Sequence, residues 1–182
     1  MPARAARRLV IDASVAGAAG GKTATAPTST NCRDFLHAVR GEHYLVILTP
    51  QLRREWDDHK SAFARTWLTA MTTRGAVIFL DLKASNKLRR EIERTVARRA
   101  AELKAMRKDF HLLEAALATD QIVVSLDEIV RALFDRAAVN VAALKNVVWV
   151  NPDKPVEEPI MWLEKNAKPE RKRMLGFRAR KR

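Results

Sequence analysis

Cysteine is nearly absent from this sequence, because Cys32 carries the one thiol among 182 residues. A single thiol can form neither an internal disulfide nor a cysteine-based metal cluster, so both kinds of stabilisation are excluded. This composition fits a protein of a reducing compartment. We expect Cys32 to be a small core residue on a helix, with a nucleophilic role as the alternative.

Long hydrophobic runs are missing as well. No stretch approaches the roughly 18 apolar residues that a membrane-spanning helix needs. Basic residues 1–8 followed by small apolar residues 9–21 give the N-terminus a weak likeness to a signal peptide. Asp12, however, places a charge in the middle of that apolar segment, which argues against export. We therefore expect a cytoplasmic protein without a membrane partner.

Acidic residues are few relative to basic ones. The chain has 34 Lys and Arg against 21 Asp and Glu, and its formal net charge is +13. Such a field attracts polyanions, so nucleic acid, ribosomes or an acidic partner are the natural candidates. The alternative is a basic surface that has no function of its own.

Apolar runs alternate with helical patterns along the first 152 residues. Strands are expected at 9–11, 44–48, 76–80, 121–125 and 147–150. Helices are expected at 32–39, from Thr49-Pro50 to Trp67, at 86–107, at 110–118 and from 126 to 134, and residues 17–30 are expected to form a loop. This alternation predicts an α/β sandwich with a mainly parallel sheet. In the second helix, Leu52, Trp56, His59, Phe63 and Trp67 recur at spacings of three and four and predict one buried face.

The composition changes after Pro152, which we take as the end of the domain. Residues 153–182 form a proline-containing, basic C-terminal extension. The apolar cluster 160–163 is expected to dock on the domain or to meet a partner. Residues 168–182 contain eight Lys or Arg and one Glu, so this tail is expected to be disordered alone and able to bind phosphates.

Residues 16–23, Ala-Gly-Ala-Ala-Gly-Gly-Lys-Thr, match a permissive phosphate-binding loop with Ala at its first position. Such a loop needs a helix that begins at its Lys-Thr pair, because the helix N-terminus holds the phosphates. Pro27 and the β-branched residues around it disfavour a long helix after Lys22. We interpret the match as a chance product of a Gly/Ala-rich segment.

Four carboxylates are placed where folding can bring them together. Asp12 and Asp127 directly follow expected strands, and ligands of parallel sheets bind outside the carboxyl ends of the strands. Glu55 lies beside the predicted buried stripe, and Asp109 is expected to open the helix 110–118, where the helix dipole would stabilise its charge. Individually, Asp109 and Asp127 could be helix caps and Glu55 a surface residue. Together they would repel one another unless a cation such as Mg²⁺ or Mn²⁺ neutralised them.

These positions resemble the motifs of the PIN-domain nucleases, in particular the toxins of bacterial and archaeal toxin–antitoxin pairs. The resemblance rests on residues 9–14, 48–56, 108–117 and 122–127 and on the closing Trp149-Val150-Asn151-Pro152, and it covers about residues 8 to 152. It implies a small three-layer α/β/α sandwich around a parallel sheet. It also implies that Asp12, Glu55, Asp109 and Asp127 hold one or two divalent metals, Mg²⁺ or Mn²⁺, with the Ser14 and Ser125 hydroxyls nearby.

The resemblance further implies a metal-dependent endoribonuclease that hydrolyses RNA phosphodiester bonds. A toxin of this kind would have an antitoxin partner, and homodimers are common in the family. The RNA backbone would be held by the tail and by basic residues of the helix 86–107, namely Arg89, Arg90, Arg94, Arg98 and Arg99. A solvated helix face is the alternative for these arginines. His59 and His111 lie near the acidic positions, where packing or a local hydrogen bond is the expected role. The competing hypothesis is a catalytically weak or inactive PIN-like RNA-binding adaptor, and a DNA nuclease ranks below both.

Overall fold

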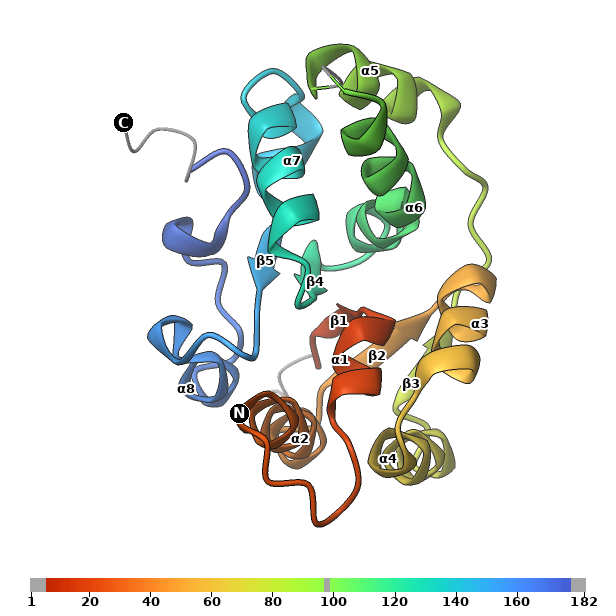
Figure 1. The fold of residues 1–182 in the computed structure, drawn as a ribbon, viewed down its shortest axis with the longest axis vertical. Coiled ribbons are helices and arrows are strands. Elements are labelled where there is room, and N and C mark those ends of the chain that lie inside the picture. Colours follow the sequence, from red (N-terminus) through yellow and green to blue (C-terminus); the bar gives the residue numbers. More distant parts are fainter. Residues whose placement is uncertain (1–5, 97–98, 178–182) are drawn as a thin grey trace.

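Five parallel strands form the centre of the protein (Figure 1). The computed structural model describes residues 6–96 and 99–177. The strand order is β3-β2-β1-β4-β5, and every neighbouring pair is parallel. The strands are β1 (Arg8–Ile11), β2 (Leu45–Leu48), β3 (Val77–Phe79), β4 (Ile122–Val124) and β5 (Val148–Val150). The predicted α/β class with a mainly parallel sheet is confirmed.

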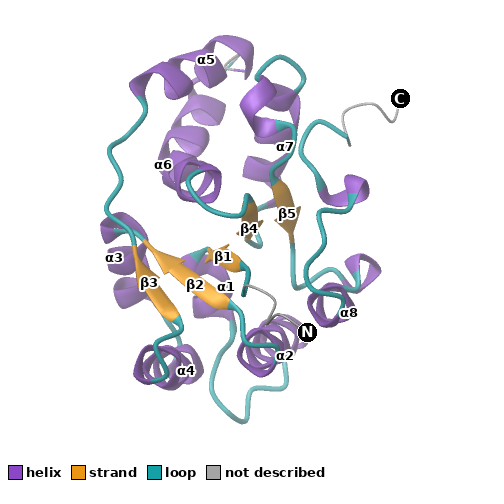
Figure 2. Cartoon of the chain, turned by 180° about the vertical axis from the view of Figure 1, so that it is seen from behind, coloured by secondary structure: helices purple, strands orange, loops and turns teal. Residues whose placement is uncertain are grey.

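Helices cover both faces of this sheet. They are α1 (Ala13–Ala18), α2 (Pro27–Gly41), α3 (Pro50–His59), α4 (Ala62–Thr73), α5 (Asn86–Val96), α6 (Ala100–Leu117), α7 (Glu128–Ala138) and α8 (Pro159–Glu164). Figures 1 and 2 show α1 to α4 on one side of the strands and α5 to α7 on the other. The predicted three-layer α/β/α arrangement is therefore confirmed. Within the described ranges, no helix combines the length and the apolar character that crossing a membrane requires.

The strand sequences are continuous apolar runs because both faces of the sheet are covered. Leu9, Val10 and Ile11 are fully buried, as are the three residues of β4. The chain moves outward from β1 to β2 and β3, then returns to the other side of β1 to form β4 and β5. The strand order thus reverses at β1, and ligands of parallel sheets bind at such a reversal, outside the carboxyl ends of the strands.

The segment 17–30, predicted to be a loop, is partly helical. Helix α1 continues to Ala18, and α2 begins at Pro27, well before the predicted start at residue 32. Proline suits the first helical position because its missing N–H would have no partner there. Gly17 permits close packing of α1 on α3, since a Cβ at this position would lie 3.0 Å from the main-chain oxygen of His59.

The single helix predicted from Thr49 to Trp67 is wrong, since the structure has two helices there. Helix α3 ends at His59, and the Ser61 hydroxyl starts α4 by accepting a hydrogen bond from the Ala64 N–H. The buried face persists across the break, because the Trp56 and Trp67 rings stack with centroids 6.0 Å apart. His59 does not share this face and is exposed, contrary to the prediction.

The boundaries predicted for the next two helices are also wrong. Helix α5 ends at Val96, and α6 runs from Ala100 through Leu117 without interruption. Met106, Phe110 and Leu113 are buried at helical spacing and hold α6 against the core. Asp109 consequently lies in the middle of α6 and not at a helix N-terminus. The expectation that a helix dipole stabilises its charge is therefore incorrect.

The C-terminal extension packs onto the domain as far as it is described. Helix α8 contacts α2, and its Trp162 and Leu163 are buried, so the predicted docking of the cluster 160–163 is confirmed for these two residues. Residues 171–173 form a 3-10 turn, after which the Leu175 N–H donates to the Val147 oxygen beside β5. The expectation of a disordered tail is wrong for residues 168–177, while 178–182 lie outside the described residues.

Candidate active site

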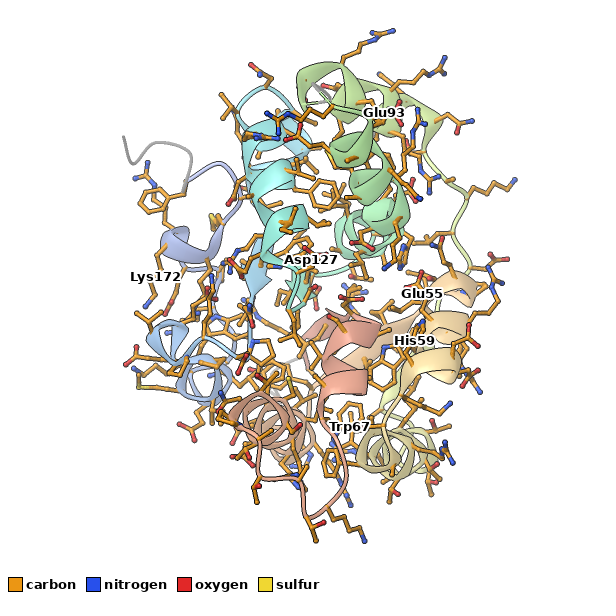
Figure 3. The ribbon with its side chains drawn as sticks, in the orientation of Figure 1. Glu55, His59, Trp67, Glu93, Asp127 and Lys172 are labelled. Atoms are coloured by element: carbon orange, nitrogen blue, oxygen red, sulfur yellow. The ribbon has the colours of Figure 1, made fainter. Side chains whose placement is uncertain are left out.

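The four predicted acidic residues line one pocket of about 310 Å³. They come from four places in the fold: the end of β1, the middle of α3, the middle of α6 and the start of α7. Figure 3 shows Glu55 and His59 on α3 and Asp127 at the start of α7. The residues around the pocket are Asp12, Ala13, Ser14, Gly17, Glu55, His59, Lys108, Asp109 and Asp127.

Asp12 is held at the centre of the sheet by its main chain and by two hydroxyls. Its N–H donates to the Val124 oxygen of β4, so the carboxylate emerges between the two central strands. One carboxylate oxygen, Oδ2, accepts hydrogen bonds from Ser14 Oγ at 2.5 Å and from Ser125 Oγ at 2.7 Å. The two serines thus lie beside Asp12, where they fix its orientation and add no charge.

Asp127 serves as the N-cap of α7, the alternative role considered for it. Its Oδ1 accepts from the Val130 N–H at 2.8 Å, and its own N–H donates to Ser125 Oγ at 3.1 Å. The cap uses one carboxylate oxygen, while the residue still lines the pocket. Ser125 therefore connects Asp12 and Asp127 through one hydroxyl.

Asp109 is the most deeply buried of the four acidic residues. It is 6% exposed, and its carboxylate has no hydrogen-bond partner among the described residues. The pKa of Asp109 is raised to about 7, mainly by burial and also by the neighbouring Asp12 and Asp127, against the opposing effect of Lys108 and His111. A negative charge here is costly unless a cation compensates it.

Glu55 is held by neighbours from α3 and α6. His111 Nδ1 donates to the Lys108 oxygen at 3.0 Å, and its Nε2 lies 3.1 Å from Glu55 Oε2, where a protonated imidazole would form a salt bridge. Gln51 Nε2 donates to Glu55 Oε1 at 3.2 Å. Burial alone would raise the pKa of Glu55, but these partners and Lys108 outweigh it, so the pKa is lowered.

The sequence patterns did not single out Lys108, Gln51 or Gly17 as site residues. Lys108 lines the pocket next to Asp109 and is its one lysine or arginine. Gln51 is one helical turn from Glu55, a spacing at which side chains on a helix meet. That spacing was the one available signal for Gln51, whereas Lys108 could be found only once α6 was known to run through residue 109.

The pocket brings the right chemical groups together without forming a ready-made ion site. In residues 6–96 and 99–177, no three His, Cys, Asp or Glu side chains are arranged so that they could hold a metal ion. The donor set nevertheless fits Mg²⁺ or Mn²⁺, which prefer carboxylate oxygens. The strongest sign of that fit is Asp109, a residue that is 6% exposed and lines the pocket together with Asp12 and Asp127.

Four of the arginines expected to contact substrate lie in the described part of the chain, and none of the four lines this pocket. Arg89 pairs with Glu114 through two hydrogen bonds of 2.9 and 2.7 Å and lies over the Phe110 ring. Arg90, Arg94 and Arg99 are exposed, and Arg98 lies outside the described residues. Arg89 thus has a structural partner, while Arg90, Arg94 and Arg99 keep their charges at the surface.

The phosphate-loop match does not have the structure its sequence would require. Lys22 is exposed and follows α1, and α2 begins five residues later, so no helix begins at Lys22-Thr23. Arg33 of α2 donates to the oxygens of Gly21 and Ala24 at 2.8 and 2.9 Å. These main-chain oxygens accept hydrogen bonds from the positively charged guanidinium of Arg33. The segment is therefore not arranged to bind an anion such as a phosphate.

Cys32 is fully buried in α2, as the sequence suggested. Burial, followed by the charge of Asp153, raises the pKa of its thiol to about 12. Because the thiolate is the reactive form, we expect iodoacetamide to leave the native protein unlabelled and to modify Cys32 in urea. Mass spectrometry measures this directly, and rapid labelling of the folded protein would contradict the assignment of Cys32 to the core.

Comparison of the sequence with protein-family models and with curated proteins finds no match. The site therefore has to be interpreted from its own chemistry.

Proposed function

We propose that the protein is a metal-dependent endoribonuclease of the PIN-domain type. The observation that carries this proposal is the pocket at the strand-order reversal, where Asp12, Glu55, Asp109 and Asp127 meet although they are far apart in the sequence. Four carboxylates in one small pocket are costly to a fold, so a use for their negative charge is the simplest reason for the arrangement.

In this mechanism, Asp12 and Asp109 would be the main ligands of a divalent metal, and Glu55 and Asp127 would complete the shell or orient the attacking water. A bound Mg²⁺ or Mn²⁺ would supply the charge that activates the water and stabilises the leaving oxygen. Ser14 and Ser125 hold the Asp12 carboxylate in place through their hydrogen bonds. Lys108 supplies the cation at the pocket wall that can attract a substrate phosphate.

RNA is the proposed substrate because the positive field of the chain attracts polyanions. The exposed Arg90, Arg94 and Arg99 are candidates for backbone contacts outside the pocket. A toxin role is part of this proposal: an antitoxin would then cover the acidic pocket, and a homodimer is the proposed assembly. A cytoplasmic location would suit an RNA substrate.

A second candidate function is a PIN-like RNA-binding adaptor with a weak or inactive site. One observation favours it: within the described ranges, no three potential ligands are arranged to hold an ion. Both functions predict that the protein binds RNA, but only the nuclease predicts that it cleaves RNA. One experiment that measures binding and cleavage can therefore distinguish them.

Asp12→Asn is expected to abolish RNA cleavage and to leave RNA binding intact. Losing this ligand should cost more than the 10–100-fold typical of groups in the outer shell of a metal site. A labelled RNA pool is incubated with Mg²⁺, with Mn²⁺ and with EDTA, and products and gel shifts are measured in the same samples.

Asp58→Asn is the matched control, since Asp58 is an exposed acid on α3 that does not line the pocket. Cleavage that needs metal and survives Asp58→Asn but not Asp12→Asn supports the nuclease. Binding without cleavage in either metal supports the adaptor. Undiminished cleavage by Asp12→Asn would rule out the four-carboxylate mechanism.

A further inference from the structure

Phe79 ends the edge strand β3 at the same side of the sheet as the pocket. It pairs with Leu48 of β2, and the register of β1 with β2 places Ile11 opposite the same Leu48. Phe79 is therefore level with Ile11, one residue before Asp12. With two strand spacings between β3 and β1, the main chains at these positions are about 10 Å apart.

This aromatic ring faces solvent. Phe79 is 58% exposed, whereas every other Phe, Trp or Tyr in the described ranges is buried or half-buried. An apolar ring of this size normally contributes to a core. A single exposed apolar side chain needs no explanation by itself. Phe79, however, lies at the same edge of the sheet as the pocket and has a charged partner.

Arg53 of α3 lies over the Phe79 ring, with its guanidinium carbon 5.6 Å from the ring centroid. The guanidinium is held in turn by Asp57, whose Oδ2 accepts from Arg53 Nε at 2.9 Å. The same helix carries Glu55 into the pocket two residues later. A flat cation and a flat ring are thus fixed next to each other beside the acidic site.

Exposed charges of both signs lie close to the ring along the chain, and Asp81 is two residues after Phe79. Arg54 on α3 and Lys83, four residues after Phe79, are both exposed. Figure 1 shows the segment between β3 and α5 passing α3 and then running beside α6. Lys108 of α6 lines the pocket itself. Arg53 thus places a cation on the ring and Lys108 places another at the pocket, which suits a ligand with both flat bases and phosphates.

We propose that Phe79 and Arg53 form a stacking platform for one base of a single-stranded nucleic acid whose neighbouring phosphate enters the pocket. This inference rests on the proposed function and specifies its substrate class. Stacking on an aromatic ring requires an unpaired base, and it tolerates any base because each has a π-face. The platform thus selects single strands over duplexes without reading sequence.

Phe79→Ala is expected to weaken the binding of single-stranded RNA about tenfold, because the stacking of one base on the ring is lost. The probe is a fluorescein-labelled single-stranded 12-mer in EDTA at fixed salt, compared with a hairpin duplex of the same composition. A 2-aminopurine in the 12-mer reports stacking by quenching. Phe79→Trp is expected to keep both affinity and quenching, and the duplex affinity is expected to change little.

Val156→Ala is the matched control, because Val156 is an apolar residue of the C-terminal extension with 85% exposure. Wild-type single-strand affinity in Phe79→Ala would overturn the platform, as would equal weakening for the duplex. Concentration-dependent self-association in sedimentation that Phe79→Ala abolishes would also overturn it, since the ring would then contact a second copy.

The proposed stacking platform and the proposed nuclease activity can be refuted independently. Cleavage that needs metal and Asp12 but is unaffected by Phe79→Ala, with unchanged affinity, refutes the platform and leaves the nuclease standing. Stacking that depends on Phe79 in a protein that cleaves nothing supports the platform and refutes the nuclease.

Discussion

Asp109→Asn is expected to make the metal-free protein more stable while it removes cleavage. Burial and the neighbouring carboxylates raise the pKa of Asp109 to about 7, so the folded state disfavours the charged form. Asparagine has nearly the same shape and no charge to bury. The carboxylate is therefore retained at a cost to the fold, as is common at functional sites.

The gain in stability of Asp109→Asn over the wild type should increase as the pH rises. An ordinary Asp has a pKa near 3.9, so between about pH 4 and 7 the unfolded chain has released a proton that the folded state still binds. The wild-type free energy of unfolding then falls as pH rises through this range. The Asp109→Asn variant does not lose stability in this way. We expect its free energy of unfolding to exceed that of the wild type by about 1–3 kcal/mol at pH 8 and by little at pH 4.

Thermal unfolding in EDTA at pH 4, 6 and 8 measures this difference. An advantage of this size corresponds to a rise in Tm of roughly 3–8 °C for a chain of this length. Adding Mg²⁺ or Mn²⁺ should stabilise the wild type and not the variant, which narrows the gap. Asp58→Asn is the control and should leave Tm unchanged. A variant that is less stable than the wild type at pH 8 would contradict the assignment of an uncompensated buried charge.

Glu157→Gln is expected to destabilise the whole protein by about 1–3 kcal/mol, because it removes one of the two carboxylates that face each buried arginine, leaving Glu128 for Arg131 and Glu170 for Arg173. Glu157 belongs to the C-terminal extension and is 7% exposed. Its Oε1 accepts from Arg131 of α7 at 2.7 Å, and its Oε2 accepts from the Asn151 N–H at 3.2 Å and lies 3.9 Å from Arg173. Arg131 and Arg173 are 1% and 3% exposed.

Urea unfolding followed by tryptophan fluorescence measures this effect, with Glu164→Gln as the control, since Glu164 is an exposed acid of the same extension. We expect the midpoint to fall with an unchanged slope, because the unfolding unit stays the same. A change below 1 kcal/mol would mean that the extension is held by its apolar contacts alone. The expected result would make residues 153–177 an integral part of the folded unit.

The strands could be predicted from the sequence because buried parallel strands are continuous apolar runs. Residues 9–11 and 121–125 are such runs, and the carboxylates that follow them, Asp12 and Asp127, reach the edge of the sheet by topology alone. Glu55 followed from the periodicity of one helix. These three pocket positions needed only local patterns and the general rule for parallel sheets.

The remaining features depend on competition between local signals and tertiary packing. Asp109 looks like a helix cap, but Met106 and Phe110 are buried on the same helix and carry α6 through it. The break after His59 is signalled by Ser61, a hydroxyl suited to start a helix, yet the apolar spacing on either side hides it. The pairing of His111 with Glu55 joins two helices that are distant in the sequence, so no local pattern reveals it.

The last described residues give the sheet a closed border. The Met174 main chain forms an antiparallel bridge to Val148, so the outer edge of β5 is partly paired within the molecule. An open strand edge can pair with another chain, and the residues around Met174 cover part of such an edge here. On the opposite border, β3 is only three residues long and offers little to recruit a further strand. Both borders of the sheet therefore expose little strand edge that could pair with another chain and start aggregation.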